Sequence, residues 1–91
     1  MTTAVRDNRE KCRYELDLGG RIVFATYRRD ATTLYIRYVE APLALRGTGA
    51  AGRLMEGVMA AARAEGLKVV PLCGYAASWL RRHRQHHDLL A

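Results

Sequence analysis

The chain has 91 residues, enough for one small domain, and its 15 Lys and Arg side chains exceed its nine Asp and Glu, giving a formal net charge of +6. This surplus favours an anionic partner, such as a phosphorylated cofactor or a nucleic acid, without choosing between them. The longest uncharged stretch, residues 69–80, is too short to span a membrane, so we expect no membrane partner.

The first residues of the chain are polar and charged. We therefore expect residues 1–11 to form a flexible N-terminal segment and residues 12–91 to form a single domain. The segment lacks the apolar run of a signal peptide. Two cysteines in a chain without an export signal are expected to be free thiols, which indicates a cytoplasmic protein.

Three strands are predicted in the first half of the chain. Apolar and charged residues alternate over residues 12–18, starting with Cys12, which is typical of a half-buried strand. Gly19-Gly20 suits a two-residue hairpin turn, after which residues 21–28 form the returning strand. Residues 33–39 are β-branched and aromatic and predict a third strand, so the first half is an antiparallel meander.

Residues 46–52, Arg-Gly-Thr-Gly-Ala-Ala-Gly, are the most informative stretch of the sequence. Small residues at the start of a helix let unpaired backbone N–H groups approach an anion, and Arg46 adds a fixed positive charge. The letters fit the dinucleotide pattern G-x-G-x-x-G, but no strand directly precedes them and no acidic residue follows at the required distance. The nucleotide pattern G-x-x-x-x-G-K-[ST] fails at Arg53 and Leu54.

The second half predicts a helix, a strand and a helix. Apolar residues recur at helical spacing over residues 51–62, and Gly66 is a helix stop. Residues 68–72 form a short buried strand, in which Pro71 indicates an edge or a bulge. Residues 75–85 form the final helix. The order is β-β-β-α-β-α, and the fold class is α+β.

Three segments together resemble a known family. Glu40-Ala41-Pro42, Arg46-Gly47-Thr48-Gly49 and Pro71-Leu72-Cys73-Gly74-Tyr75 follow one another at the distances found in the compact GNAT-like (Gcn5-related N-acetyltransferase) family of very short acetyltransferase-like proteins with a Cys-x-Tyr motif. The resemblance covers about residues 12–90. It implies a minimal GNAT-like fold, in which two neighbouring strands splay apart and hold the pantetheine arm of acetyl-CoA.

The same resemblance implies a cofactor loop and an activity. The loop pattern, (Gln/Arg)-x-x-Gly-x-(Gly/Ala), would bind the cofactor's pyrophosphate through the following residues: Leu45, Arg46, Gly47, Thr48, Gly49, Ala50, Ala51 and Gly52. The implied function is that of an acetyl-CoA-binding N-acetyltransferase acting on an amine. The sequence does not identify that amine, which can be a small molecule or a protein amine, nor does it indicate the oligomeric state.

Three residues are candidates for the chemistry. Glu40, at the end of the third strand, is the best carboxylate for accepting a proton from the amine; its alternative is an exposed ion-pair partner. Cys73 precedes a helix N-terminus, which favours a thiolate nucleophile that relays the acetyl group; its alternative is a small buried side chain. Tyr75 resembles the tyrosine that protonates the leaving thiolate in larger relatives; its alternative is packing.

One departure from the family pattern leaves the function open. Tyr38 stands where the family usually has a histidine near the cleft, so a catalytically silent module that binds or senses acyl-CoA is an alternative. The basic charge supports a third possibility, a nucleic-acid-binding module, although no known RNA-binding pattern is present.

Basic residues and histidines are concentrated near the end of the chain. The spacing of His83, His86 and His87 does not fit a zinc site, so we expect no metal. Arg81, Arg82 and Arg84 form a basic cluster that is either a solvated helix face or a contact for phosphate.

Overall fold

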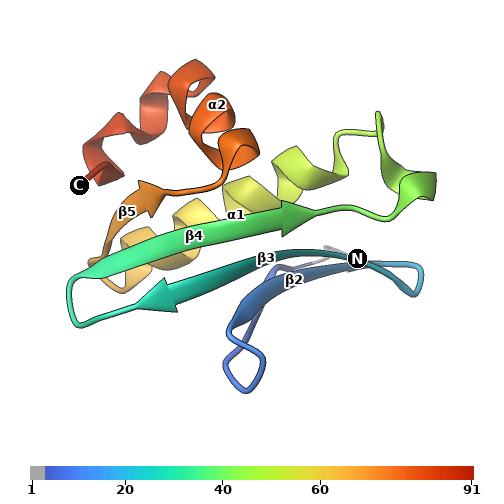
Figure 1. The fold of residues 1–91 in the computed structure, drawn as a ribbon, viewed down its shortest axis with the longest axis horizontal. Helices are drawn as coiled ribbons and strands as arrows, with labels where there is room; N and C mark the ends of the chain where they lie inside the picture. Colours follow the sequence, from blue (N-terminus) through green and yellow to red (C-terminus); the bar gives the residue numbers. More distant parts are fainter. Residues whose placement is uncertain (1–3) are drawn as a thin grey trace.

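The computed structural model describes residues 4–91 as one sheet with helices packed against it (Figure 1). The first three residues of the predicted N-terminal segment lie outside the described part. The elements, in chain order, are β1 (Arg6–Asn8), β2 (Arg13–Leu18), β3 (Arg21–Arg29), β4 (Thr33–Glu40), the 3-10 helix η1 (Leu43–Leu45), α1 (Ala50–Ala64), β5 (Lys68–Pro71), α2 (Gly74–Arg82) and the 3-10 helix η2 (Arg84–Leu89).

The sheet has the order β1-β2-β3-β4-β5. Strands β1 to β4 are antiparallel neighbours, and β5 joins β4 in parallel after the crossover through α1. The predicted α+β class and the predicted meander followed by α-β-α are confirmed. The predicted order β-β-β-α-β-α is present, with one further short strand, β1, at the edge of the meander.

The core lies between the sheet and α1, which runs behind β4 in Figure 1. Helix α1 buries an apolar stripe, as its helical spacing predicted. The buried residues of α1 are Ala50, Leu54, Met55, Val58, Met59 and Ala62. Gly66, at φ 69°, adopts the left-handed conformation that ends the helix, and the chain then enters β5.

The N-terminal segment is more ordered than predicted. Within the predicted flexible residues 1–11, Arg6–Asn8 form β1 and pair with residues 13–15 of β2. Val5 packs against Gly57 of α1, where a Cβ at position 57 would lie 2.1 Å from a Val5 methyl group. The side chain of Asp7 also accepts a hydrogen bond of 2.6 Å from the Tyr27 hydroxyl. These tertiary contacts order residues 5–8, which composition alone predicted to be flexible.

Two element boundaries also differ from prediction. Cys12 was expected at the start of a strand but lies exposed in the turn before β2, at φ 51°. The final helix was expected over residues 75–85, whereas α2 ends at Arg82 because His83, at φ −110° and ψ 77°, leaves the helical conformation. Helix η2 then returns along α1, and Leu90 forms a bridge with Val69 of β5.

The pairing of β4 with β3 is interrupted by a bulge shortly before the end of β4. Tyr27 of β3 pairs with Ile36, and Thr26 pairs with Tyr38, so Arg37 is left out of the register as a bulge. Pairing between β4 and β5 ends at Ile36 and Pro71, and the next two backbone N–H groups of the chain both donate to the Ile36 carbonyl. Beyond this point the two strands separate, and β4 continues to Glu40.

Within residues 4–91, no helix combines the length and the apolar character needed to cross a membrane.

Candidate functional site

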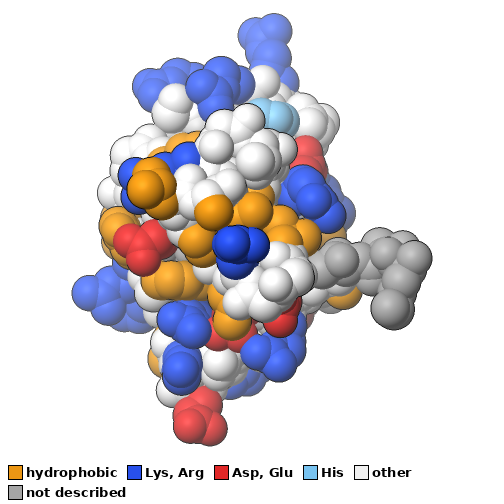
Figure 2. Space-filling view, turned by 90° about the vertical axis from the view of Figure 1, so that its right-hand side faces the viewer, with side chains coloured by type: hydrophobic (Ala, Val, Ile, Leu, Met, Phe, Trp, Pro, Cys, Tyr) orange, Lys and Arg blue, Asp and Glu red, His pale blue; other side chains and the backbone are white. Residues whose placement is uncertain are grey.

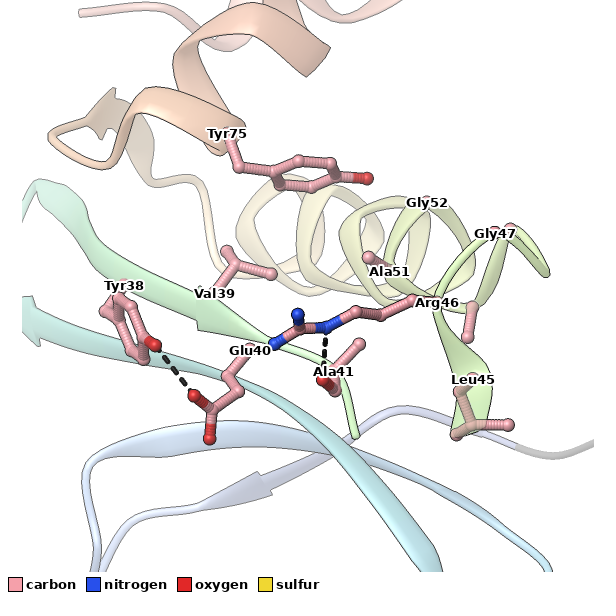
Figure 3. Close-up of a pocket in the computed structure, with 12 residues that line it drawn as sticks. Tyr38, Val39, Glu40, Ala41, Leu45, Arg46, Gly47, Ala51, Gly52 and Tyr75 are labelled. Atoms are coloured by element: carbon pink, nitrogen blue, oxygen red, sulfur yellow. Dashed lines mark hydrogen bonds between the residues drawn. The ribbon is translucent and has the colours of Figure 1, made fainter. Parts of the chain in front are cut away.

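A cavity of about 370 Å³ opens beside the last residues of β4, where β4 and β5 have separated (Figure 3). Its walls come from three elements: the end of β4, the loop into α1 with the first turn of that helix, and the start of α2. The lining residues are Tyr38, Val39, Glu40, Ala41, Leu45, Arg46, Gly47, Gly49, Ala50, Ala51, Gly52 and Tyr75.

The loop wall combines two left-handed glycines with the uncapped N-terminus of α1. Gly47 and Gly49 adopt φ values of 79° and 83°, which residues with a Cβ rarely reach, and this curls the backbone around the cavity. Gly49 is the N-cap of α1 and supplies no side-chain cap, and the first turn of the helix has no acidic residue. The first N–H groups of α1 therefore keep their capacity to bind a ligand, and the helix dipole adds a partial positive charge.

Arg46 is the cation of this wall. Its side chain extends across the cavity toward β4, and its Nε donates to the carbonyl oxygen of Ala41 at 3.5 Å (Figure 3). Among the described residues, no carboxylate forms an ion pair with Arg46. The guanidinium thus retains most of its donors and its full charge for a ligand.

The strand wall carries a hydrogen-bonded pair. The hydroxyl of Tyr38 donates to Oε1 of Glu40 at 2.7 Å, as Figure 3 shows. This hydrogen bond and the charge of Glu40 raise the pKa of Tyr38, so the phenol stays neutral at physiological pH. Tyr38 and Glu40 pair with Thr26 and Phe24 of β3, whereas Val39 pairs with buried Ala25. The hydrogen-bonded side chains of Tyr38 and Glu40 therefore lie on the sheet face opposite the core, at the edge of the cavity.

Tyr75, in the first turn of α2, points over the cavity from the side opposite Glu40 (Figure 3). Burial raises its pKa, and a nearby Cys73 thiolate would raise it further, while Arg82 acts in the opposite direction. The phenol therefore stays protonated at neutral pH, as a proton donor must.

Cys73 is placed beside the cavity rather than in its wall. It is the N-cap of α2, with an extended backbone and no side-chain cap. Its side chain is half-buried against the core, and it is not one of the lining residues.

The surroundings of the site are apolar and basic. The exposed large hydrophobic side chains of residues 4–91 are Tyr38 and Tyr75, which line the cavity, Leu43 in η1, and Leu72 just after β5. Figure 2, which faces the loop end of the molecule, shows apolar side chains near the centre, with Lys and Arg among and around them and a smaller number of Asp and Glu farther out. This combination suits a ligand with an apolar arm and an anionic group.

The structure brings most of the sequence-predicted residues together. Apart from Thr48, every residue of the predicted cofactor loop lines the cavity, as do Glu40 and Tyr75. Thr48 instead donates through its hydroxyl to the Leu45 carbonyl, inside the loop.

Sequence reasoning did not name Tyr38, Val39 or Ala41 as site residues, although it placed Tyr38 at the position of the family's histidine near the cleft. One sequence feature could have identified Tyr38 as a site residue. It is two positions before Glu40, the predicted site residue at the end of this strand, and residues two apart point to the same face of a strand. The bulge at Arg37, which sets the direction of that face, has no sequence signature here.

The histidines near the chain end make contacts with neighbouring elements. Nε2 of His86 lies 2.7 Å from Oε1 of Glu56 on α1, and the His83 ring stacks on Trp79. In the described part of the chain, no group of three or more His, Cys, Asp or Glu side chains is arranged to hold a metal ion.

Comparison with known protein families gives one match. The model of the GCN5-related N-acetyl-transferase family matches residues 13–89, which cover most of the chain, both halves of the site and the strands between them. A search of curated proteins found no matching relative.

Proposed function

The chain belongs to the GCN5-related N-acetyltransferase family, and on that premise we propose that it binds acetyl-CoA in the cavity beside β4 and transfers the acetyl group to an amine. One observation carries the proposal: the loop with free helix N–H groups, two left-handed glycines and an unpaired Arg46 forms one wall of the same cavity that Tyr75 and Glu40 line. An anion site and candidate proton-transfer groups thus share one space.

The residues fit the parts of acetyl-CoA in order. Arg46 and the N–H groups of residues 47–52 would hold the pyrophosphate. The pantetheine arm carries amide groups, and the backbone of β4 beyond Ile36, which no described strand pairs on its β5 side, offers hydrogen-bond partners for them. The thioester would then lie near Tyr75 and Glu40. When bound, acetyl-CoA supplies an acetyl group activated by its thiolate leaving group.

Each candidate side chain has a defined task in the proposed reaction. An alkyl amine with a pKa near 10.4 is mostly protonated at neutral pH, so Glu40 would accept a proton from it, directly or through a water. Tyr75, protonated, would donate to the sulfur that leaves. Holding the two reactants at attack distance would contribute much of the remaining rate enhancement.

Two routes for the acetyl group remain within the proposal. In the direct route, the amine nitrogen forms the new bond to the acetyl carbon as the carbon–sulfur bond breaks. In the relay, the Cys73 thiolate first takes the acetyl group and releases the CoA thiolate, which is then protonated; the amine next attacks the acetyl-cysteine and regenerates Cys73. Since Cys73 does not line the cavity, the relay requires its half-buried side chain to turn toward the thioester.

A catalytically silent acyl-CoA-binding module is the second candidate function. It is favoured by Tyr38, which occupies the strand position of the family's usual histidine and whose hydroxyl donates to Glu40. Such a module would bind acetyl-CoA in the same cavity but form no acetylated product. Product formation therefore separates it from the transferase.

The loop assignment is tested with Arg46→Glu. We expect the affinity for acetyl-CoA to fall at least about 100-fold, since the variant removes charge-assisted hydrogen bonds and places a negative charge beside the pyrophosphate. Titration calorimetry measures the affinity, and a thermal melt checks the fold. Lys11→Glu, which changes the net charge equally on an exposed turn residue, is the control and should bind as wild type does. Equal affinity of wild type and Arg46→Glu would overturn the assignment.

The route of the acetyl group is tested by intact mass after incubation with acetyl-CoA. A gain of one acetyl group that disappears in Cys73→Ser supports the relay. Product formation with no such gain, and with full activity in Cys73→Ser, supports direct transfer.

A further inference from the structure

We propose that the amine acceptor is the N-terminus of an acidic peptide, which lies along the uncovered face of the sheet with its carboxylates against Arg37 and Arg28. The inference rests on the proposed function, because it takes the acetyl group to be transferred beside Glu40. It names the class of the acceptor and the two residues that select it.

The first observation is that one face of the sheet carries no helix. The core is a single cluster that includes the buried residues of both α1 and α2, so the two helices pack on the same side. Trp79 of α2 also approaches Gly52 of α1, where a Cβ would lie 3.4 Å from the Trp79 Nε1. In Figure 1, α1 runs behind β4, and no helix lies in front of β3 or β4. The face opposite the core is therefore open to a ligand over these two strands.

The second observation is that the candidate base lies on this open face. Tyr38 and Glu40 pair with the outward-facing residues of β3, and Tyr75 lies on the opposite side of the cavity (Figure 3). An amine that meets Glu40 therefore approaches over the sheet. Beyond Glu40 the chain enters the proposed cofactor loop, so the rest of the acceptor would extend in the other direction, back along β4.

The third observation is that two exposed arginines lie on the same face. Arg37, in the bulge of β4, directly follows buried Ile36. Arg28 directly precedes Arg29, whose side chain pairs with Glu65 of α1 on the core side. Since successive residues of a strand point to opposite faces, the side chains of Arg37 and Arg28 both point to the open face.

The two arginines lie close together and at a defined distance from Glu40. Arg28 is paired with Tyr35, which stands two positions before Arg37 on the neighbouring strand. Glu40 is three residues beyond Arg37, roughly 10 Å at the rise of a strand. An extended peptide covers this distance in about three residues. With its N-terminal amine at Glu40, the carboxylates of its third and fourth residues would reach the two arginines.

Both arginines keep their charge for a ligand. Among residues 4–91, no carboxylate forms an ion pair with either of them. Other carboxylates of these strands and turns have partners of their own. Glu15 is paired with Arg6 and Arg13, and Asp30 accepts hydrogen bonds from Thr32 within its own turn. The open face thus has an acidic group where the amine would lie and free basic groups beside it, which complements a peptide amine followed by carboxylates.

The aromatic residues of the open face favour a peptide over a nucleic acid. The Arg28 guanidinium carbon lies 4.4 Å from the centroid of the Tyr35 ring, and that of Arg13 lies 4.5 Å from the Phe24 ring. These guanidinium groups cover the rings on which the bases of a single strand would stack. The N–H groups at the edge of the Arg28 guanidinium still point outward from the stack and suit a carboxylate.

The test compares three peptides on three proteins. The peptides have six residues and no lysine, so the N-terminus is their only amine. They differ only at positions three and four, which are both Glu, both Gln or both Arg. Mass spectrometry measures kcat/KM for acetylation of each peptide by wild type, Arg37→Glu and Arg84→Glu. Arg84→Glu is the control, because it changes the charge equally on an exposed residue of η2, which contacts α1. Thermal melts confirm that the variants are folded.

We expect wild type to acetylate the Glu peptide with a kcat/KM at least about fivefold above that of the Gln peptide, since each exposed ion pair contributes a few-fold. The Arg peptide should react most slowly, and added salt should reduce the differences. Arg37→Glu should favour the Arg peptide over the Glu peptide, and Arg84→Glu should keep the wild-type order.

Three results would overturn the inference and leave the proposed function intact. The first is equal kcat/KM for the three peptides with wild type, and the second is a wild-type order in Arg37→Glu. The third is acetylation of small alkyl amines with none of the peptides acetylated. Binding of a single-stranded oligonucleotide that Arg37→Glu abolishes, together with equal kcat/KM for the peptides, would assign the face to nucleic acid instead. Acetylation of no amine at all would overturn the proposed function and this inference with it.

Discussion

Tyr75 and Glu40 differ in what the structure lets them do with a proton. Burial raises the pKa of Tyr75, so the phenol remains a donor across the physiological range. Glu40 already accepts a hydrogen bond from Tyr38 through Oε1, and its second carboxylate oxygen accepts none from residues 4–91. One residue is therefore suited to give a proton and the other to take one, which is the division of labour that acetyl transfer to an amine requires.

Tyr75→Phe tests the donor role. Removing the hydroxyl should lower kcat by about 100-fold or more, the usual contribution of a general acid, and should change the affinity for acetyl-CoA little, because the ring and its packing remain. Steady-state kinetics and calorimetry measure the two quantities. Tyr35→Phe, on β4 but away from the cavity, should match wild type. An undiminished kcat in Tyr75→Phe would show that the phenol packs against the ligand without donating.

Sequence reasoning reached the site residues unevenly. The loop and Tyr75 were predictable because glycines, a basic residue and a family motif mark them in the sequence. Cys73 was predicted at a helix N-terminus and is found there, but its partial burial against the core depends on how α2 packs. Tyr38 became part of the site through the bulge at Arg37, which depends on the pairing of β3 with β4.

At the scale of elements, the N-terminal strand shows how a tertiary contact overrides composition. Residues 6–8 are polar, and nothing in their pattern predicts a strand. They are held because Val5 fills the space above Gly57, and because Asp7 is bonded to Tyr27. The glycine within α1 is thus explained by the close approach of Val5, since a glycine inside a helix otherwise costs about 1 kcal/mol relative to alanine.

Gly57→Ala tests this contact. In an open helix position the change would stabilise the protein by about 1 kcal/mol, but here the new methyl group displaces Val5. We therefore expect no gain in the free energy of unfolding, together with faster amide hydrogen exchange in β1. The double variant Val5→Gly/Gly57→Ala should recover the helical gain relative to Val5→Gly alone. A plain stabilisation by Gly57→Ala, with β1 still protected, would contradict the contact.

The helices and longer strands were predictable for a physical reason. Their apolar residues recur with a period of two or of 3.6 over enough residues to identify each type, as in β2 and α1. The end of α2 was not predictable from the sequence. The chain turns at His83 so that η2 can pack along α1, where His86 contacts Glu56 and Asp88 pairs with Arg63. Such contacts between distant segments have no local pattern.

At the scale of the whole molecule, a buried carboxylate at the edge of the sheet makes the stability of the fold depend on pH. Glu15 is 4% exposed and accepts hydrogen bonds from side chains of β1 and β2. The hydrogen bond from Arg6 is the main cause that lowers the pKa of Glu15 to about 2, with further hydrogen bonds from Arg13 and Asn8, while burial acts in the opposite direction.

The sign of the pH dependence follows from this lowered pKa. In the unfolded chain a glutamate titrates near about 4.3, so the stabilisation by Glu15 is complete above that pH and is lost as the pH falls toward 2. Glu15→Gln should lower the free energy of unfolding at pH 7 by about 1–3 kcal/mol, because two arginines lose a charged partner. Urea unfolding measured from pH 7 to pH 3 should show that the free energy of unfolding falls less with acidification in the variant than in the wild type. An identical pH dependence would exclude Glu15 as its source.

The whole molecule joins the loop proposed to bind an anion, a gap between strands and two proton-transfer candidates in one small domain. The measurement that tests the proposed activity most directly is mass spectrometry of amines incubated with the protein and acetyl-CoA. The panel should include small alkyl amines, lysine-containing peptides and free peptide N-termini. We predict an N-acetylated product with release of one coenzyme A for each acetyl group transferred. Tight binding of acetyl-CoA with no acetylated amine anywhere in the panel would contradict transferase activity and identify the chain as a silent acyl-CoA-binding module.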